Sequence, residues 1–317
     1  MSSTVAPATS TEVFQSGSYK THLQNLNPPP PCRTKTRPIP SPPPKPLLIA
    51  SPTEAGEFPV LMFLHGFLLS NNFYSQLIQH VASHGFIVVA PQLYTVAGPD
   101  ATEEINLAAA ITNWLAGGLQ QFLPELVKPD LTRLGLAGHS RGGKTAFALA
   151  LKKELATTTT LRFSVLIGVD PVDGMDTGKQ THPPVLSYVP GSFDLDMPVM
   201  VIGSGLGELR RNPLFPACAP KGVNHEQFFR ECREPACYFV VKDYGHLDML
   251  DDETRGVRGK VSYCLCKNGE SREPMRRFVA GAMVGFMRAY MEGDSDDLKA
   301  IRAGDTGPIE LTTAEFL

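Results

Sequence analysis

The strongest chemical signal in the sequence is a serine set between two glycines. Gly138, Ser140 and Gly142 form the pattern G-x-S-x-G, between a run predicted as a strand (131–137) and one predicted as a helix (142–154). In a nucleophile elbow the serine occupies a strained turn from strand to helix, and the glycines let neighbouring backbone pass closely. A serine that only caps a helix suits this position too, but it needs no glycine on both sides. The pattern therefore predicts that Ser140 is a nucleophile.

A serine hydroxyl needs a general base to remove its proton, and that base needs a third group to orient it. Catalytic groups in parallel α/β sheets gather at the carboxyl ends of the strands. His246 follows the last predicted strand, 238–242, and is therefore predicted to be the base. His139 is next to the serine, but the turn should point its ring elsewhere. His182 and His225 fall in long loops, where a solvated surface position is expected.

The orienting carboxylate is predicted to be Asp170, at the end of the predicted strand that follows the elbow helix. Because the residue before a proline is conformationally restricted, an Asp-Pro pair at a strand end holds its carboxylate rigidly, although such pairs also form ordinary turns. Hydrolases more often place this acid one strand later, where the sequence offers only Glu208. Asp173 is a near competitor, and Asp248 and Asp251 lie too close in sequence to the base to orient it easily.

Two backbone N–H groups usually stabilise the negative charge that develops on a carbonyl oxygen during acyl transfer. One is predicted at Arg141, the residue after the nucleophile. The other is predicted at Phe67, in the loop after the predicted strand 60–64, where Gly66 frees the backbone to turn inward. We interpret His65, in the same loop, as a brace for the loop rather than a second base.

The elements that must position these residues alternate along the chain. Short apolar runs and helical patterns follow one another from about residue 46, which predicts an α/β fold with a mostly parallel sheet and helices on both of its faces. The predicted strands are 60–64, 86–91, 131–137, 163–169, 198–202 and 238–242, and the predicted helices are 72–83, 103–119, 142–154 and 273–291.

A long irregular insertion, about 206–235, separates the last two predicted strands, and an ordered loop of this length is more often a lid or binding loop than a mere connector. Candidates for an apolar substrate pocket are Leu68 and Phe73 near the oxyanion loop, with Phe215 and Phe228 in the insertion. The alternative is that these aromatic side chains simply pack the loops onto the body of the protein.

The N-terminal segment differs in composition from the rest of the chain. Residues 1–45 are rich in Pro, Ser and Thr, and we expect them to be partly disordered, with a short edge strand near 13–22. Acidic residues are rare there, as in plastid transit segments, and no secretory signal is evident. Residues 46–317 are expected to form the catalytic domain.

Composition excludes several classes of function. Hydrophobic residues make up 42% of the chain and the net charge is −3, so no basic field favours nucleic acid as a partner. No apolar run reaches the ~18 residues of a membrane-spanning helix, which leaves only peripheral membrane contact open.

The six cysteines are sparse, and reduced, mostly buried thiols in an intracellular protein are expected. A redox or disulfide role is the alternative for Cys218, Cys232, Cys237, Cys264 and Cys266. The pair Cys264 and Cys266 lacks partners at zinc-site spacing, so no metal is expected.

Four segments together resemble the plant chlorophyllases of the α/β-hydrolase superfamily. They are Phe63-Leu64-His65-Gly66-Phe67, Ala90-Pro91-Gln92-Leu93-Tyr94, the elbow from Gly138 to Phe147, and Asp243-Tyr244-Gly245-His246-Leu247-Asp248-Met249-Leu250.

The resemblance implies an α/β-hydrolase fold and hydrolysis of the phytyl ester of chlorophyll by water, giving chlorophyllide and phytol. It implies the catalytic triad Ser140, Asp170 and His246, and no cofactor, because the magnesium ion belongs to the substrate. A plant cell, with the chloroplast favoured over the cytosol, is the expected location. The alternatives are a general carboxylesterase or lipase on the same fold, and a non-catalytic binding protein with a hydrolase-like fold.

Overall fold

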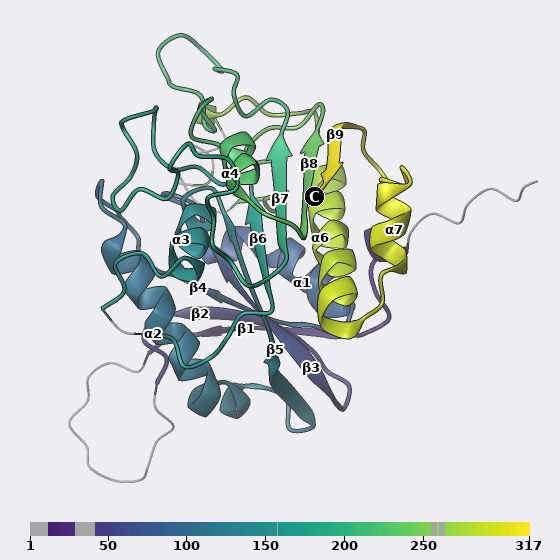
Figure 1. Cartoon of the computed structure of the whole chain (residues 1–317). Helices are drawn as coiled ribbons and strands as arrows, with labels where there is room; N and C mark the ends of the chain where they lie inside the picture. Colours follow the sequence, from purple (N-terminus) through teal and green to yellow (C-terminus); the bar gives the residue numbers. More distant parts are fainter. Residues whose placement is uncertain (1–11, 29–41, 157, 255–258, 260–263) are drawn as a thin grey trace, which may run out of the picture.

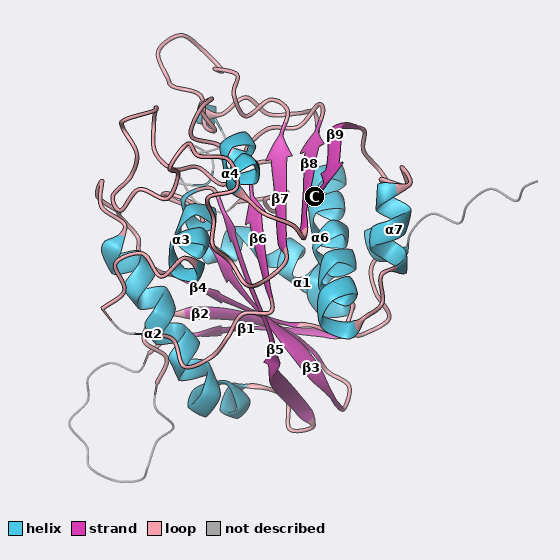
Figure 2. Cartoon of the chain, viewed as in Figure 1, coloured by secondary structure: helices cyan, strands magenta, loops and turns pink. Residues whose placement is uncertain are grey.

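The computed structural model describes residues 12–28, 42–156, 158–254, 259 and 264–317. These residues form a nine-stranded sheet with helices on both sides (Figures 1 and 2). In order along the chain the strands are β1 (Thr21–Leu26), β2 (Leu47–Pro52), β3 (Gly56–Leu64), β4 (Ile87–Pro91), β5 (Val127–His139), β6 (Val165–Val169), β7 (Val199–Ser204), β8 (Ala236–Val241) and β9 (Leu311–Phe316).

The order of strands across the sheet is β1-β2-β4-β3-β5-β6-β7-β8-β9. The six central strands, from β4 to β8, run parallel, and β1, β2 and β9 join the two sides antiparallel. The predicted mostly parallel sheet is therefore confirmed. Because the central strands run parallel, their carboxyl ends meet along one edge, where the loops carrying the candidate catalytic residues begin.

Two groups of helices cover the sheet. They comprise α1 (Ser75–Ser83), α6 (Glu273–Met287) and α7 (Asp296–Arg302) on one face, and α2 (Thr102–Gly118), α3 (Arg141–Ala150) and α4 (His225–Glu231) on the other. The structure also contains the short helices η1 (Glu12–Phe14), η2 (Asn71–Tyr74) and η3 (Leu119–Phe122) and the π-helix η4 (Arg288–Glu292). Among the described residues, no helix is both long enough and apolar enough to cross a bilayer.

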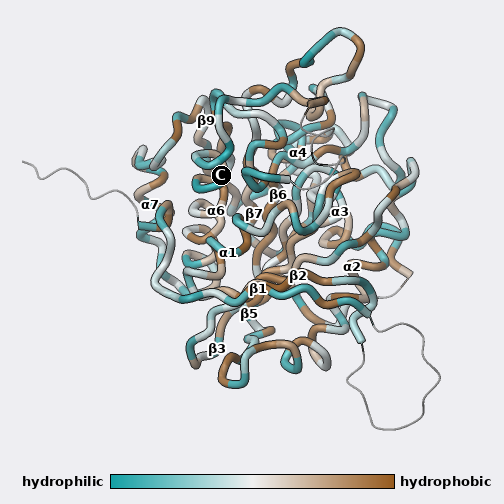
Figure 3. The backbone as a smooth tube through the Cα atoms, turned by 180° about the vertical axis from the view of Figure 1, so that it is seen from behind, coloured by the Kyte–Doolittle hydropathy of each residue, from teal (hydrophilic) through white to brown (hydrophobic). Residues whose placement is uncertain are grey.

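Strand β3 shows why the central strands are apolar at every position. Leu61 and Phe63 pack into the core under α1 and α6, whereas Val60, Met62 and Leu64 pack into the core under α2 and α3. Successive side chains of a strand point to opposite faces, so a strand with two covered faces needs apolar residues throughout. In Figure 3, which views the molecule from behind, brown marks the hydrophobic residues along the strands at the centre of the sheet.

Several boundaries differ from the sequence-based prediction. The edge strand begins at Thr21, because Val13 and Phe14 are buried in the core beside α6 instead of pairing with the sheet. Residues 1–11 and 29–41, which belong to the segment predicted to be partly disordered, lie outside the described residues. Helix α3 stops at Ala150 and not at residue 154, since the chain turns there with positive φ at Lys152.

Two of the cysteines are paired. Cys218, in the insertion after β7, is bonded to Cys266, in the segment after β8, across a sequence separation of 48 residues. The expectation of reduced thiols is therefore wrong for this pair, and Cys266 is not available as a zinc ligand together with Cys264. Both segments run along the carboxyl edge of the sheet, which brings them together. Cys232 and Cys237 are buried free thiols, and Cys264 is free and exposed.

This disulfide gives a first prediction. A cross-link stabilises a fold mainly by restricting the unfolded chain, so Cys218→Ser is expected to lower the free energy of unfolding by about 2–4 kcal/mol. Denaturant-induced unfolding measures the difference. Cys264→Ser makes the same chemical change at an exposed free thiol and should leave the midpoint in place. Equal midpoints for Cys218→Ser and the wild type would show that the cross-link does not support the fold.

Candidate active site

Ser140 occupies a strained turn between the last residue of β5 and the first residue of α3. Its backbone has φ 56° and ψ −124°. A Cβ on Gly138 would lie 2.2 Å from the carbonyl oxygen of Gly142, and a Cβ on Gly142 would lie 2.3 Å from the carbonyl oxygen of Leu64. Only glycine fits at either position. The two glycines therefore let α3 begin directly against β3 and β5, which places the serine hydroxyl at the sheet edge.

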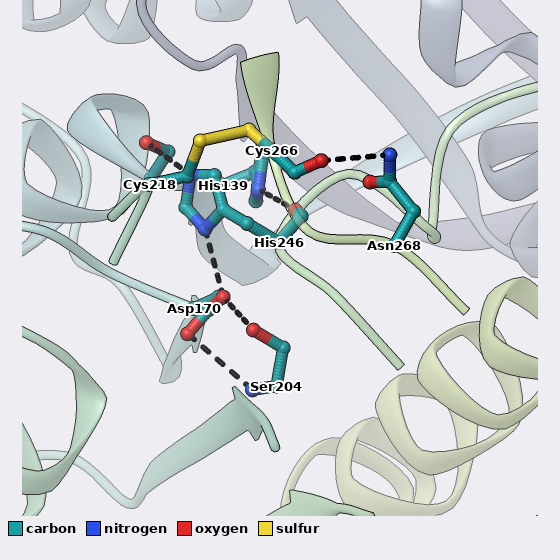
Figure 4. The surroundings of a disulfide bond; sticks show 8 residues. His139, Asp170, Ser204, Cys218, His246, Cys266 and Asn268 are labelled. Atoms are coloured by element: carbon teal, nitrogen blue, oxygen red, sulfur yellow. Dashed lines mark hydrogen bonds and ion pairs between the residues drawn. A yellow bond between two sulfur atoms is a disulfide. The ribbon is translucent and has the colours of Figure 1, made fainter. Parts of the chain in front are cut away.

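The structure brings Ser140, His246 and Asp170 together in one hydrogen-bonded chain. His246 Nε2 lies 2.8 Å from Ser140 Oγ, and His246 Nδ1 lies 2.7 Å from Asp170 Oδ2. The three residues follow the carboxyl ends of β5, β8 and β6, and Figure 4 shows the contact between His246 and Asp170. In this geometry the imidazole can take the serine proton while the carboxylate holds the opposite ring nitrogen.

Asp170 is fully buried. Burial alone would raise the pKa of this carboxyl, but the neighbouring His246, together with His225 and a hydrogen bond from the Ser204 hydroxyl, holds the pKa at about 2. Ser204 ends β7, and its backbone N–H also donates to Asp170 Oδ1 at 3.4 Å (Figure 4). The carboxylate is therefore ionised at neutral pH and suited to stabilise an imidazolium.

His139 supports the backbone of the candidate base. Its Nε2 donates to the carbonyl oxygen of His246 at 2.8 Å, and its Nδ1 accepts from the Tyr74 hydroxyl at 2.7 Å. The backbone N–H of Gly66 in turn donates to the Tyr74 oxygen at 3.1 Å. Burial lowers the pKa of His139 to about 3, so the ring is neutral and can both donate and accept. This chain fixes the oxyanion loop, the elbow and the base relative to one another.

The loop after β3 is braced against the nucleophile. His65 Nε2 accepts the backbone N–H of Leu93 at 3.0 Å, which confirms its interpretation as a brace. A Cβ on Gly66 would lie 3.1 Å from Ser140 Cβ, so the glycine allows the loop to approach closely. The next residue is Phe67, whose N–H is the predicted oxyanion donor on this side. On the other side, Arg141 opens α3, and the first N–H groups of a helix point outward and favour negative charge.

The side chain of Arg141 has a separate function that sequence reasoning missed. Its guanidinium is paired with the buried Glu104 of α2 at 2.5 Å and donates to the carbonyl oxygen of Gly98 at 2.7 Å. The same group lies against the rings of Phe67 and Tyr94, 5.6 and 5.7 Å from their centroids. A cation between two aromatic rings and a carboxylate links the oxyanion loop to α2 and α3. Glu104 lies in the predicted helix 103–119, and no pattern in the sequence indicated that it pairs with Arg141.

The competing acids near the elbow and in the insertion have other partners. Asp173 Oδ2 accepts the backbone N–H groups of Val185 and Leu186 at 2.8 and 3.0 Å, and so holds the loop between β6 and β7. Glu208 accepts from the side-chain amide of Asn224 at 2.8 Å. Neither carboxylate hydrogen-bonds to the histidine that contacts Ser140.

The acids that follow the candidate base in sequence support neighbouring turns. Asp248 Oδ2 accepts the backbone N–H groups of Gly245 and Gly269, at 2.6 and 2.7 Å, and so fixes the turn that presents the base. Asp251 accepts the backbone N–H of Ser75 at 3.2 Å at the start of α1. The prediction that these acids do not orient the base agrees with these contacts.

His225 corrects one of the sequence-based expectations. His182 is exposed as predicted, but His225 is only 5% exposed. The insertion contains helix α4, which starts at His225 and whose first turn is capped by the Asn224 side chain. The imidazole therefore points into the protein, with Nε2 at 3.8 Å from Asp170 Oδ1. An Asn before a helical pattern was the available signal for this helix.

The four pocket candidates have different environments. Phe228 is fully buried, with its ring centroid 4.9 Å from that of Phe147, so its assignment to a substrate pocket is wrong and it belongs to the core under α4. Phe73 is also a core residue, and the surface hollow that it lines includes Gln76 and Asp252 but not Ser140. Leu68 and Phe215 remain accessible, in the oxyanion loop and in the insertion.

Comparisons with known proteins agree with this geometry. The family model described as Chlorophyllase matches residues 9–317. Chlorophyllase-2 of Arabidopsis thaliana is 57% identical, with 99% of this chain and 100% of the relative aligned. The chain belongs to the chlorophyllase family. Chlorophyllase-1, chloroplastic, of Citrus unshiu is 45% identical over 96% of this chain and 88% of the relative. Chlorophyllase type 0 of Chenopodium album is 44% identical over 82% of this chain and 75% of the relative.

Membership of the chlorophyllase family confirms the α/β-hydrolase fold and identifies the chain as an enzyme, a carboxylic-ester hydrolase. Within the described part of this chlorophyllase-family chain, no group of three His, Cys, Asp or Glu side chains is arranged to hold a metal ion.

The buried carboxylate gives the second prediction. Asp170→Asn keeps the size of the side chain but lets an amide face His246 Nδ1, which favours the wrong tautomer of the imidazole, so kcat for ester hydrolysis should fall about 10⁴-fold. Glu208→Gln is the matched control. It removes the charge of the acid that follows β7, and its amide oxygen can still accept the hydrogen bond from Asn224. We therefore expect kcat to stay close to the wild-type value. Comparable losses in both variants would argue against Asp170 as the orienting acid.

Proposed function

We propose that this protein hydrolyses the phytyl ester of chlorophyll to chlorophyllide and phytol, with Ser140 as nucleophile, His246 as general base and Asp170 as orienting acid. The observation that carries the proposal is the hydrogen-bonded chain from Ser140 Oγ through both nitrogens of His246 to Asp170, in a chain of the chlorophyllase family.

In the first half of the reaction, Ser140 Oγ attacks the carbonyl carbon of the ester while His246 Nε2 takes the hydroxyl proton. The backbone N–H groups of Phe67 and Arg141 receive the negative charge on the carbonyl oxygen. When the tetrahedral intermediate collapses, the bond to the phytyl oxygen breaks and that oxygen takes the proton from His246. Phytol leaves, and the chlorophyllide acyl group remains on Ser140.

In the second half, water replaces phytol. His246 takes a proton from the water molecule as its oxygen attacks the acyl carbon, and the same N–H groups stabilise the second oxyanion. Collapse breaks the bond to Ser140 Oγ, which regains its proton from the imidazole. Chlorophyllide is released as the carboxylic acid. We propose no cofactor for these steps, since the Ser140 proton leaves with phytol and a proton from water replaces it on Ser140.

The distribution of exposed apolar side chains supports a large apolar substrate. Loops that follow the carboxyl ends of the parallel strands are the ones that surround the site. They carry many of the exposed apolar side chains, namely Phe67 after β3, Val96 after β4, Met175 after β6 and Leu209, Leu214 and Phe215 after β7. Leu214 is 88% exposed. Exposed apolar groups gathered on one edge favour contact with a lipid-like ligand or a membrane surface, as a phytyl ester in a membrane requires.

For the compartment, we propose the chloroplast of a plant cell. Two Citrus relatives carry the word chloroplastic in their names, and the N-terminal segment is poor in acids. The Arabidopsis relative at 57% identity carries no such word.

Product analysis tests the proposal. Purified protein incubated with chlorophyll in mild detergent should release chlorophyllide and phytol in equal amounts. Ser140→Ala removes the nucleophile, so turnover should drop by at least about 10³-fold, with the thermal unfolding midpoint unchanged.

A simple nitrophenyl ester at matched concentration serves as the comparison substrate. If the protein cleaved it readily and left chlorophyll intact, it would be a general esterase. If a fluorophosphonate probe failed to label Ser140 in the wild type, the nucleophile itself would be wrongly assigned.

A further inference from the structure

Asp170 lies between two imidazoles, and only one of them belongs to the proposed triad. His246 faces Oδ2, whereas His225 Nε2 faces Oδ1 at 3.8 Å. We infer that His225 is a positioning residue, which holds the Asp170 carboxylate ionised and rotated so that Oδ2 faces the catalytic histidine. This inference rests on the proposed roles of Ser140, His246 and Asp170.

The tautomer of His225 follows from its other contact. Its Nδ1 lies 2.7 Å from the Tyr238 hydroxyl. Burial raises the pKa of Tyr238, so the phenol keeps its proton and can donate it to Nδ1. The proton of the neutral ring then sits on Nε2 and points toward the carboxylate. The opposite tautomer would turn the lone pair of Nε2 toward a buried anion, which is unfavourable.

The ring of His225 has little freedom to choose another partner. A Cβ on Gly203 would lie 2.4 Å from its Nδ1, so β7 can pass this ring only with glycine at that position. Asn224, the residue before, donates its side-chain amide to Glu208 and caps α4. Among the described residues, Nε2 has no acceptor within hydrogen-bond distance, and Asp170 Oδ1 is the acid oxygen that it faces.

Burial is what keeps the imidazole of His225 neutral, although acidic side chains lie nearby. Burial is the main cause that lowers its pKa, and the nearby His246 lowers it further, against the opposing effect of the acids Asp170, Glu208 and Glu226. A neutral N–H donor compensates part of the carboxylate charge without adding a second cation beside the imidazolium that forms during catalysis.

This arrangement predicts a specific change in pH dependence. Without the N–H dipole, the Asp170 carboxylate becomes more basic, and the Asp170–His246 pair retains its shared proton to a higher pH. Because a base that stays protonated cannot activate the serine, the acid limb of the rate profile should move to higher pH. A purely structural defect would lower the rate at all pH values and leave this limb in place.

The experiment compares three variants by the rate of fluorophosphonate labelling of Ser140 across pH, and by kcat and KM for chlorophyll. His225→Phe keeps a ring but removes the donor, so we expect labelling and kcat to fall about tenfold, less than for loss of a direct oxyanion donor. KM should stay constant, and the acid limb should move upward. His225→Gln offers an amide N–H near the position of Nε2. It should recover part of the rate, and the acid limb of its pH–rate profile should lie at the wild-type pH.

Tyr238→Phe removes one hydroxyl and tests the same claim if His225→Phe does not fold. It should move the acid limb in the same direction, because the tautomer of His225 is no longer fixed. The inference would be overturned if His225→Phe had the wild-type rate and the wild-type acid limb of the pH–rate profile. It would also be overturned if His225→Phe and His225→Gln lost the same amount of activity and the acid limb did not move in either variant. A wild type that resists labelling would instead contradict the proposed function, so the two failures are distinguishable.

Discussion

The site is organised around one buried negative charge. A carboxylate removed from water is costly unless it is hydrogen-bonded and paired, and Asp170 is fully buried at the end of β6. Its compensation comes from three separate parts of the chain, which are Ser204 at the end of β7, His246 after β8 and His225 at the start of α4. The requirement to compensate this charge thus fixes the relative positions of the strand ends and the insertion.

A second set of contacts fixes the imidazole from its backbone side. His139, the last residue of β5, holds the carbonyl oxygen of His246, and Tyr74 connects His139 to the oxyanion loop at Gly66. The nucleophile, the base and the oxyanion loop therefore share one network of neutral donors and acceptors. Since each contact in such a network restricts the next, displacing one member should disturb the others. The disulfide between Cys218 and Cys266 lies beside this network (Figure 4).

Local patterns in the sequence predicted the parts of the site that depend on local constraints. The glycines around Ser140 are required by the backbone of the turn itself, and Asp170 and His246 follow strands whose apolar runs are visible in the sequence. The disulfide and the buried position of His225 depend on contacts between segments far apart in the chain. The number of apolar residues in a loop does not say which of them reach the core, which is why Phe228 was misassigned.

The central claim is that Asp170 and His246 share a hydrogen bond in the resting enzyme. A proton on imidazole Nδ1 held by a buried carboxylate gives a strongly deshielded resonance, so a one-dimensional proton spectrum of the wild type near neutral pH tests the claim most directly. The account predicts a far-downfield signal that disappears in both His246→Gln and Asp170→Asn. The absence of any such signal that depends on His246, or its survival in Asp170→Asn, would contradict the account.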